Sequence, residues 1–215
     1  YFARHTKDFY CFYRDNMLCL DAKPNAVHLK LAELERAGKL KAVVTQNIDG
    51  LHQQAGSRTV YELHGSVHRN YCTKCRTFYG VDFIAKGEDV PCCPVCGGLV
   101  KPDVVLYEEP LDGETMARAV EAIQEADLMI VGGTSLAVYP AAGLINYYRG
   151  SRLELINKAP TPYDSHADLV IAGKMMRTRL RLQQHPNAVI RIKLDSRVQE
   201  DELLHAVIIF IVAYM

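Results

Sequence analysis

The sequence has 215 residues, 49% of them hydrophobic and 23% charged, which is the composition of an ordinary globular protein rather than of a disordered chain. This length is enough for one well-packed domain with a small attachment, and it excludes two full-sized domains. Lys and Arg together equal Asp and Glu at 25 each, so overall charge favours neither a nucleic acid nor a membrane surface as a partner.

Helical and strand patterns alternate along the chain. Residues 25–37 are predicted to form an amphipathic helix, which Pro24 and Asn25 open and Gly38 follows. The apolar run at 40–45 has the length of a strand. The further elements expected are, in chain order, a helix at 116–123, a strand at 127–131, a helix at 139–148 and strands at 153–157 and 167–171. Apolar strands joined to helices by short Gly-containing turns predict a doubly wound, Rossmann-like α/β fold with a parallel sheet.

Residues 67–101 interrupt this alternation with a cysteine-rich segment, which we interpret as a small inserted module of the zinc-ribbon type. Cys72 and Cys75 form one pair with a two-residue gap, and Cys93 and Cys96 form a second pair after seventeen further residues. Four thiolates at this spacing can surround one Zn²⁺, and a metal with four protein ligands is structural rather than catalytic. A disulfide pair or a chance pattern is the less favoured interpretation.

Cys92, beside Cys93, is an alternative ligand, although its gap of three to Cys96 fits a zinc site less well. Seven cysteines in this pattern indicate a reducing compartment rather than a secreted disulfide framework. The first residues show neither a long apolar core nor a small-residue cleavage site, so we expect no signal peptide and a cytoplasmic protein.

Polar side chains gather where the strand at 40–45 ends. Gln46, Asn47 and Asp49 follow it directly, and in an open α/β sheet ligands bind at the carboxyl ends of the strands. The other interpretation is a capped helix start, with Asn47 or Asp49 as the N-cap residue. Farther along, His64 stands at a strand end before a glycine, where a general base can act, although a lone histidine is more often structural.

Two later turns also carry polar groups at strand ends. The Gly-Gly-Thr-Ser turn at 132–135 follows a buried strand and precedes a helical pattern, and its backbone N–H groups can meet phosphate or ribose oxygens. The sequence contains no G-x-G-x-x-G motif, so this turn is a weak signal by itself. Asn157 and Lys158 end another strand and suit a ribose contact, or else they form a simple polar loop.

The chain from Thr6 to Lys174 resembles the sirtuins, the NAD-dependent protein lysine deacylases, through five motifs in order: Thr-Gln-Asn-Ile-Asp-Gly-Leu-His, Glu-Leu-His-Gly-Ser, the two cysteine pairs, Gly-Gly-Thr-Ser-Leu-Ala-Val-Tyr-Pro and Leu-Ile-Asn-Lys. Residues 104–109, Val-Val-Leu-Tyr-Glu-Glu, make it most similar to the bacterial type. The resemblance implies removal of acyl groups, most often acetyl, from the lysines of proteins or peptides. NAD is the implied co-substrate, and nicotinamide and O-acyl-ADP-ribose are the implied products.

The resemblance also implies roles for particular residues. His64 is implied to be the catalytic base. The residues implied to bind NAD are Gln46, Asn47, Asp49, Gly132, Thr134, Ser135, Asn157 and Lys158. Those implied to bind the substrate peptide as an added strand are Val104, Val105, Leu106 and Val138. Structural zinc is assigned to Cys72, Cys75, Cys93 and Cys96.

The resemblance divides the chain into an NAD-binding domain at 1–66 and 102–174, a zinc-binding module at 67–101 and an unmatched tail at 175–215. The family's first strand and its Gly-Ala-Gly-x-Ser loop have no counterpart here, so we expect a fragment that binds NAD weakly. The alternative functions are an inactive remnant that only binds peptides and zinc, and an ADP-ribosyltransferase that uses the same pocket.

The tail ends in a ten-residue apolar stretch at 206–215, about half the length that a membrane-spanning helix needs. We therefore expect no membrane span. The stretch is expected either to promote aggregation beside an open sheet edge or to fill the place of the absent strand.

Overall fold

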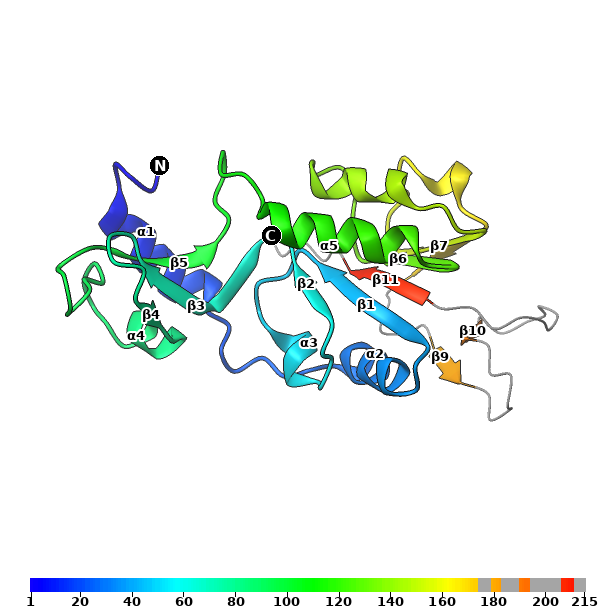
Figure 1. The fold of residues 1–215 in the computed structure, drawn as a ribbon, viewed down its shortest axis with the longest axis horizontal. Helices are drawn as coiled ribbons and strands as arrows, with labels where there is room; N and C mark the ends of the chain where they lie inside the picture. The colour runs from blue at the N-terminus through cyan, green and yellow to red at the C-terminus, as the bar shows by residue number, and fades with distance from the viewer. Residues whose placement is uncertain (174–178, 183–189, 194–205, 211–215) are drawn as a thin grey trace. The chain divides into compact units, whose positions relative to one another are not determined.

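The computed structural model describes residues 1–173, 179–182, 190–193 and 206–210 (Figure 1). The chain divides into two compact units, which are described separately. Unit 1 contains residues 1–22, 48–50 and 64–109, and unit 2 contains residues 23–47, 51–63 and the chain from Pro110 onward. Among the described residues, no helix has both the length and the apolar character to cross a membrane.

A six-stranded parallel sheet forms the centre of unit 2, with the strand order β2-β1-β11-β6-β7-β8. The strands are β1 (Leu40–Thr45), β2 (Val60–Glu62), β6 (Leu128–Gly132), β7 (Arg152–Asn157), β8 (Leu169–Ala172) and β11 (Ala206–Phe210). Both faces of β6 are buried, because Met129 and Val131 belong to one hydrophobic cluster while Leu128 and Ile130 belong to another. This arrangement confirms the predicted Rossmann-like α/β fold.

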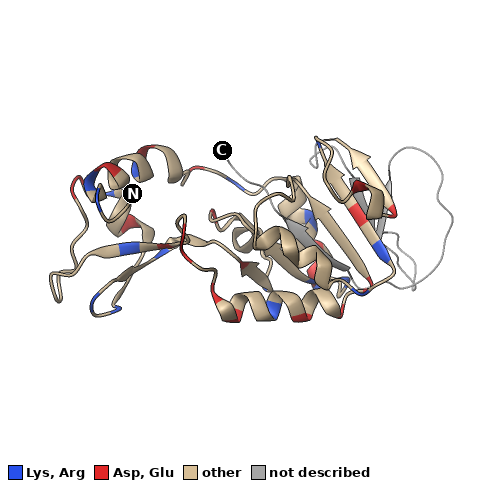
Figure 2. Cartoon of the chain, turned by 90° about the horizontal axis from the view of Figure 1, so that it is seen from above, with Lys and Arg blue, Asp and Glu red and all other residues tan. Residues whose placement is uncertain are grey.

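Helices cover the two faces of this sheet, and Figure 1 shows α5 on one face and α2 on the other. The helical segments of unit 2 are α2 (Ala26–Arg36), α3 (Leu51–Gln54), α5 (Gly113–Gln124) and the 3-10 helices η2 (Ala141–Tyr147) and η3 (Asp164–His166). The start of α2 is well capped, because the Asn25 side chain accepts hydrogen bonds from the N–H groups of Val27 and His28 at 2.9 and 3.3 Å. Figure 2 shows acidic and basic positions interspersed along α5, where Arg118 pairs with Glu114 at 2.6 Å.

Strand β11 lies in the middle of the sheet, paired in parallel with β1 on one side and with β6 on the other. Phe210 is level with Thr45 of β1 and with Gly132 of β6, so the three strands end at the same edge. Residues 206–210 of the apolar stretch therefore fill a strand position, which is one of the two outcomes expected for that stretch. Elsewhere in the tail, β9 (Arg179–Leu182) and β10 (Ile190–Lys193) form an antiparallel pair. Lys174, the last residue of the predicted NAD-binding domain, and residues 175–178, 183–189, 194–205 and 211–215 of the predicted tail lie outside the described residues.

Unit 1 is built on a three-stranded antiparallel sheet with the order β4-β3-β5. Its elements are α1 (Thr6–Phe12), the π-helical segment η1 (Tyr13–Met17), β3 (Gly65–Cys72), β4 (Phe78–Tyr79), α4 (Val81–Ala85) and β5 (Val100–Val104). The N-terminal helix shares a core with this sheet, since Phe9, Tyr10 and Tyr13 cluster with Ile84 and Val100. The Tyr10 hydroxyl donates to the carbonyl oxygen of Val100 at 2.6 Å, which joins α1 to β5.

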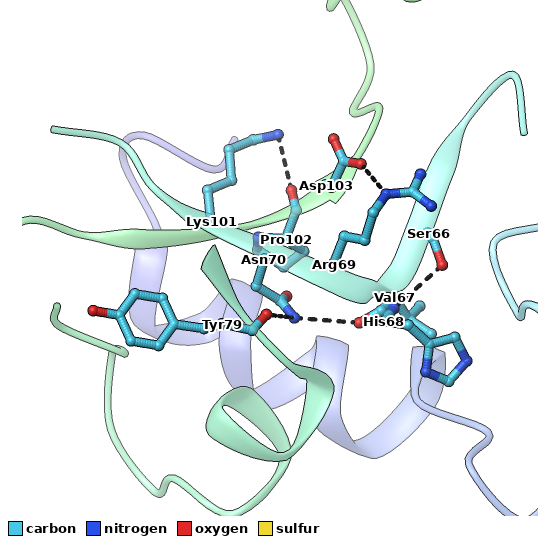
Figure 3. Close-up of polar contacts among 9 residues, drawn as sticks. All are labelled: Ser66, Val67, His68, Arg69, Asn70, Tyr79, Lys101, Pro102 and Asp103. Atoms are coloured by element: carbon cyan, nitrogen blue, oxygen red, sulfur yellow. Dashed lines mark hydrogen bonds and ion pairs between the residues drawn. The ribbon is translucent and has the colours of Figure 1, made fainter. Parts of the chain in front are cut away.

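Strand β3 contains a bulge, which Figure 3 shows in detail. Ser66 is level with Asp103 and Asn70 with Pro102, so residues 67–69 have no partner positions on β5. The fully buried Asn70 side chain closes the bulge by donating to the carbonyl oxygens of Val67 at 3.4 Å and of Tyr79 at 3.2 Å (Figure 3). An ion pair of 2.8 Å between Arg69 and Asp103 also links the bulge to β5.

Candidate active site and metal centre

The carboxyl end of β1 carries the first two candidate residues of unit 2. Gln46 and Asn47 are both buried, and the Asn47 backbone N–H donates to the Thr45 hydroxyl at 3.0 Å. The Oδ1 atom of Asn47 is buried and accepts no hydrogen bond from the described protein. This excludes Asn47 as the N-cap residue of α3, because an N-cap oxygen accepts a backbone N–H. A buried acceptor without a protein partner suits a ligand that brings its own N–H donor, such as the carboxamide of NAD.

The turn after β6 is shaped by backbone and side-chain hydrogen bonds. Gly133 has a φ of +68°, which favours glycine, and its N–H donates to the carbonyl oxygen of Ile156 at 3.0 Å. The buried Thr134 hydroxyl accepts from the Leu136 N–H at 3.0 Å, whereas Ser135 is exposed. The helix predicted at 139–148 is a 3-10 helix that begins only at Ala141, so the turn does not lead straight into it. The turn therefore offers N–H groups and hydroxyls without a helix dipole behind them.

The end of β7 supplies the third group of candidate residues in unit 2. The Nδ2 atom of Asn157 donates to the carbonyl oxygens of Thr134 at 2.7 Å and of Ala159 at 2.9 Å. Lys158 beside it is exposed. Because β1, β6 and β7 are parallel and end level with one another, the candidate residues of unit 2 stand at one edge of the sheet. That edge is where an open α/β sheet binds its ligands.

In unit 1, His64 lies in the turn before β3 and is partly buried. Its carbonyl oxygen accepts a hydrogen bond from the Val105 N–H at 3.1 Å. The next residue, Gly65, is level with Val104 and has a φ of +75°, and a Cβ there would lie 1.8 Å from the Asp103 carbonyl oxygen. Only glycine fits at such an approach. The structure thus brings the candidate base together with the candidate peptide strand, whereas Val138, which belongs to unit 2, is half exposed.

The segment around Asp49 is anchored by a residue that the sequence analysis did not single out. The His68 ring donates from Nε2 to the carbonyl oxygen of Asp49 at 3.0 Å, and the Val67 N–H donates to the Ile48 carbonyl oxygen at 2.9 Å. Gly50 has a φ of +69°, and a Cβ there would lie 2.7 Å from the His68 ring. The glycine in the Asn-Ile-Asp-Gly motif was the only local signal of this close approach.

Four cysteines of unit 1 form a candidate metal centre. The sulfur atoms of Cys72, Cys75, Cys93 and Cys96 lie within 4.8 Å of one another. Cys72 and Cys96 have their Sγ atoms 3.4 Å apart, and those of Cys75 and Cys93 are 3.6 Å apart. Sulfurs bound to a tetrahedral Zn²⁺ at about 2.3 Å each are about 3.8 Å from one another, so this set fits the ion. The four cysteines are positioned to bind one zinc ion.

Neighbouring groups shift the pKa values of these thiols in opposite directions, since hydrogen bonds with the other cysteine side chains raise the pKa of Cys96. A hydrogen bond with Thr77 lowers the pKa of the Cys75 thiol to about 6, and the Tyr79 hydroxyl lies 3.0 Å from the Cys93 sulfur. Cys92, the alternative ligand, is exposed, and its thiol lies 3.5 Å from the Val90 carbonyl oxygen instead. The sulfur of Cys93 lies in the cluster of four, which supports the choice of Cys93 over Cys92.

Comparison with known proteins places these features in a family. The model of the Sir2 family matches residues 1–140. An NAD-dependent protein deacetylase of Clostridium acetobutylicum is 59% identical over 182 residues, which cover 83% of this chain and 74% of the relative. An NAD-dependent protein deacetylase of Clostridium perfringens is 60% identical over 172 residues, covering 80% of this chain and 70% of the relative.

Solved structures agree with this assignment. The structure described as a Sir2, p53 peptide and NAD⁺ complex has a TM-score of 0.77 and 42% identity, covering 81% of this chain and 75% of the other. The structure described as Sir2 bound to acetylated peptide has a TM-score of 0.76 and 40% identity, covering 81% and 76%. The resemblance that the sequence motifs carry is therefore confirmed, and the chain belongs to the Sir2 family.

Proposed function

We propose that this protein removes acyl groups, most often acetyl, from lysine side chains of proteins or peptides with NAD as the co-substrate. The products are free lysine, nicotinamide and O-acyl-ADP-ribose. The observation that carries the proposal is the hydrogen bond from the Val105 N–H to the His64 carbonyl oxygen, because it joins the candidate base to the candidate peptide strand. The names of the deacetylase relatives and the NAD and peptide complexes among the solved structures support it.

The NAD-binding residues of unit 2 have groups that suit its parts. NAD, when bound, supplies the ADP-ribose that takes up the acyl group. Gln46 and Asn47 offer buried amides to the nicotinamide end, and Asn47 Oδ1 is an acceptor that still needs a donor. Gly132, Thr134 and Ser135 offer N–H groups and hydroxyls to phosphate and ribose, and Lys158 adds a positive charge. In unit 1, Asp49 completes the proposed set.

His64 is the proposed base. A neutral imidazole has a nitrogen lone pair that takes a proton at neutral pH, as the transfer of an acyl group to a ribose hydroxyl requires. Val104, Val105, Leu106 and Val138 are proposed to hold the peptide as an added strand, in which main-chain hydrogen bonds give affinity with little dependence on sequence. We also propose a cytoplasmic location, which the centre of four free thiols supports because thiols persist in reducing compartments.

The test is product analysis by mass spectrometry, with an acetylated peptide and saturating NAD. The wild-type protein should release nicotinamide and O-acetyl-ADP-ribose in equal amounts. His64→Ala should lower turnover at least about 100-fold, the lower range for loss of a general base, whereas the exposed His166→Ala should keep it. Nicotinamide release with ADP-ribose attached to protein would instead identify an ADP-ribosyltransferase. Peptide binding without nicotinamide release would identify an inactive remnant.

A further inference from the structure

The turn that follows β5 is held by two side chains of opposite charge. The Lys101 ammonium lies 2.9 Å from the Oε2 atom of Glu109 and donates to the carbonyl oxygen of Val104 at 3.1 Å. The same Oε2 atom of Glu109 accepts from the Leu106 N–H at 2.9 Å, and the Glu109 N–H donates to the Leu106 carbonyl oxygen at 3.0 Å. The two side chains of this ion pair therefore hydrogen-bond to the backbone at both Val104 and Leu106. We call Lys101 and Glu109 the clasp.

The ion pair of the clasp is partly shielded from solvent. The Lys101 side chain is 22% exposed and that of Glu109 is 40% exposed, so water screens the pair only in part. Burial by itself would raise the pKa of Glu109, but the Leu106 N–H and the Lys101 ammonium outweigh it and lower that pKa. The carboxylate therefore stays ionised at neutral pH and keeps both of its hydrogen bonds charge-assisted.

The backbone that the clasp holds would not keep its shape by strand pairing alone. Strand β5 ends at Val104, and beyond it the Val105 N–H is bound to His64. The turn then passes through Glu108, which has a φ of +72°, a strained conformation for a residue other than glycine. Tyr107 is fully exposed and packs against nothing that could hold the turn. The side-chain hydrogen bonds of the clasp hold the turn in place of strand pairing and packing.

We infer that Lys101 and Glu109 are positioning residues, which fix the backbone of Val104, Val105 and Leu106 in the form that receives the acylated peptide. This inference rests on the proposed function, in which these three residues bind the peptide. An added strand needs a preformed edge, because ordering the edge at the moment of binding would cost affinity. The clasp acts on the peptide and leaves NAD binding to Asp49 and to the proposed residues of unit 2.

The experiment compares three variants with the wild type. Lys101→Met keeps the length of the side chain and removes the ammonium, and Glu109→Gln keeps the shape and removes the charge. Glu108→Gln is the matched control, since it removes a neighbouring charge that is exposed. Zinc content and thermal midpoint are measured for each variant, so that a folding defect is recognised. Lys101→Arg restores a cation and should recover part of the loss.

We expect the KM for an acetylated peptide to rise about tenfold in Lys101→Met and Glu109→Gln, the effect of losing one charge-assisted contact. The KM for NAD and kcat at saturating peptide should change less than about twofold, and amide hydrogen exchange in residues 104–109 should become faster. A peptide KM that stays at the wild-type value in both variants would overturn the inference and leave the deacylase function standing. A wild-type protein that shows no peptide-dependent nicotinamide release would overturn both.

Discussion

The amide nitrogen of Asn157 donates to the carbonyl oxygen of Thr134 at 2.7 Å, so the loop after β7 holds the loop after β6 in place. Its second bond, to Ala159, fixes the other side of the same amide. A side chain that links two strand-end loops sets the spacing of the groups that NAD is proposed to meet. This contact lies within unit 2.

Replacing Asn157 with alanine should therefore weaken NAD binding. Losing two neutral hydrogen bonds of about 1 kcal/mol each predicts a KM for NAD roughly 10- to 30-fold higher. Asn157→Asp should be no better, since a carboxylate cannot donate to the two carbonyl oxygens. Asn146→Ala is the control, because Asn146 is exposed on η2. Steady-state kinetics at saturating peptide measure the effect, and equal NAD KM values for Asn157→Ala and Asn146→Ala would refute it.

Metal analysis should find one zinc ion per chain. Cys93→Ala should lose that zinc and lower the thermal midpoint, because it removes one of the four clustered sulfurs and metal binding contributes to folding. Cys92→Ala should keep the zinc, since the Cys92 thiol lies outside the sulfur cluster. Inductively coupled plasma mass spectrometry of the two purified variants decides between them. Full zinc in Cys93→Ala would show that another group serves as the fourth ligand.

The buried pair of His28 and His52 predicts a loss of stability in acid. Burial and the neighbouring His28 lower the pKa of His52 to about 3, and the two ring centroids are 4.6 Å apart. The unfolded chain takes up this proton near pH 6.5, whereas the folded chain does so only near pH 3. Folding stability should therefore fall as the pH drops below about 6.5, by roughly 2 kcal/mol at pH 5 from this group.

Chemical unfolding of the wild type and of His52→Leu at pH 7.5 and pH 5 measures this effect. The variant should lose less folding stability between pH 7.5 and pH 5, because it lacks the one imidazole that takes up a proton on unfolding. The comparison removes the effect of thiolate protonation at the zinc centre, which both proteins share. His166→Ala is the matched control, since that ring is exposed and should leave the pH dependence unchanged. Parallel pH curves for wild type and His52→Leu would contradict the assignment.

Proline in β11 should break the sheet. Ile208 is level with Val43 on one side and with Ile130 on the other, in the interior of the six-stranded sheet. Proline removes a backbone N–H that the ladder of hydrogen bonds needs, so it is not tolerated in a central strand. Ile208→Pro should aggregate in size-exclusion chromatography, whereas Ile208→Val should remain monodisperse. A monodisperse Ile208→Pro protein with an unchanged thermal midpoint would show that β11 does not stabilise the sheet.

Residues 1–215 by themselves should bind NAD weakly. Strand β11 completes the sheet, but the 215-residue sequence contains no Gly-rich loop that could present several N–H groups to the pyrophosphate. Losing even two charge-assisted hydrogen bonds of about 1.5 to 3 kcal/mol each weakens binding by roughly two to four orders of magnitude. Isothermal titration calorimetry on monodisperse protein measures the affinity. Binding in the low micromolar range would show that other residues supply the missing contacts.

The sequence was a good guide to elements whose signals are local. Strand β1 occupies the predicted residues 40–45, and α2 lies within the predicted 25–37, because Asn25 caps its start and Gly38 takes a φ of +69° after its end. The cysteine spacing led for the same reason to four cysteines whose sulfurs lie close together, since each pair lies on one short turn. The domain boundaries drawn from the sequence stay a prediction, as do the roles of the individual site residues.

The sequence was a poor guide to contacts between distant segments. No local pattern shows that Tyr10 binds the carbonyl oxygen of Val100, ninety residues away, or that α1 packs with the cysteine-bearing sheet. The contact between Lys101 and Glu109 is equally hard to predict, because a Lys and a Glu eight residues apart fit no helical or strand periodicity. The Oδ1 atom of Asn47 is buried and has no hydrogen-bond partner among the described residues, and this too depends on surroundings that only the folded chain determines.

Because β11 lies in the centre of the sheet, the sheet can be completed only late in synthesis on the ribosome. Synthesis runs from the N-terminus, so β1 and β6 emerge well before the strand that lies between them. During that interval each of them presents an unpaired backbone edge, the kind of surface that pairs with other chains. Contacts over such long sequence separations also form slowly. The demand for chaperone protection should therefore be highest late in translation, and a chain whose synthesis stops before Ala206 would lack the strand between β1 and β6.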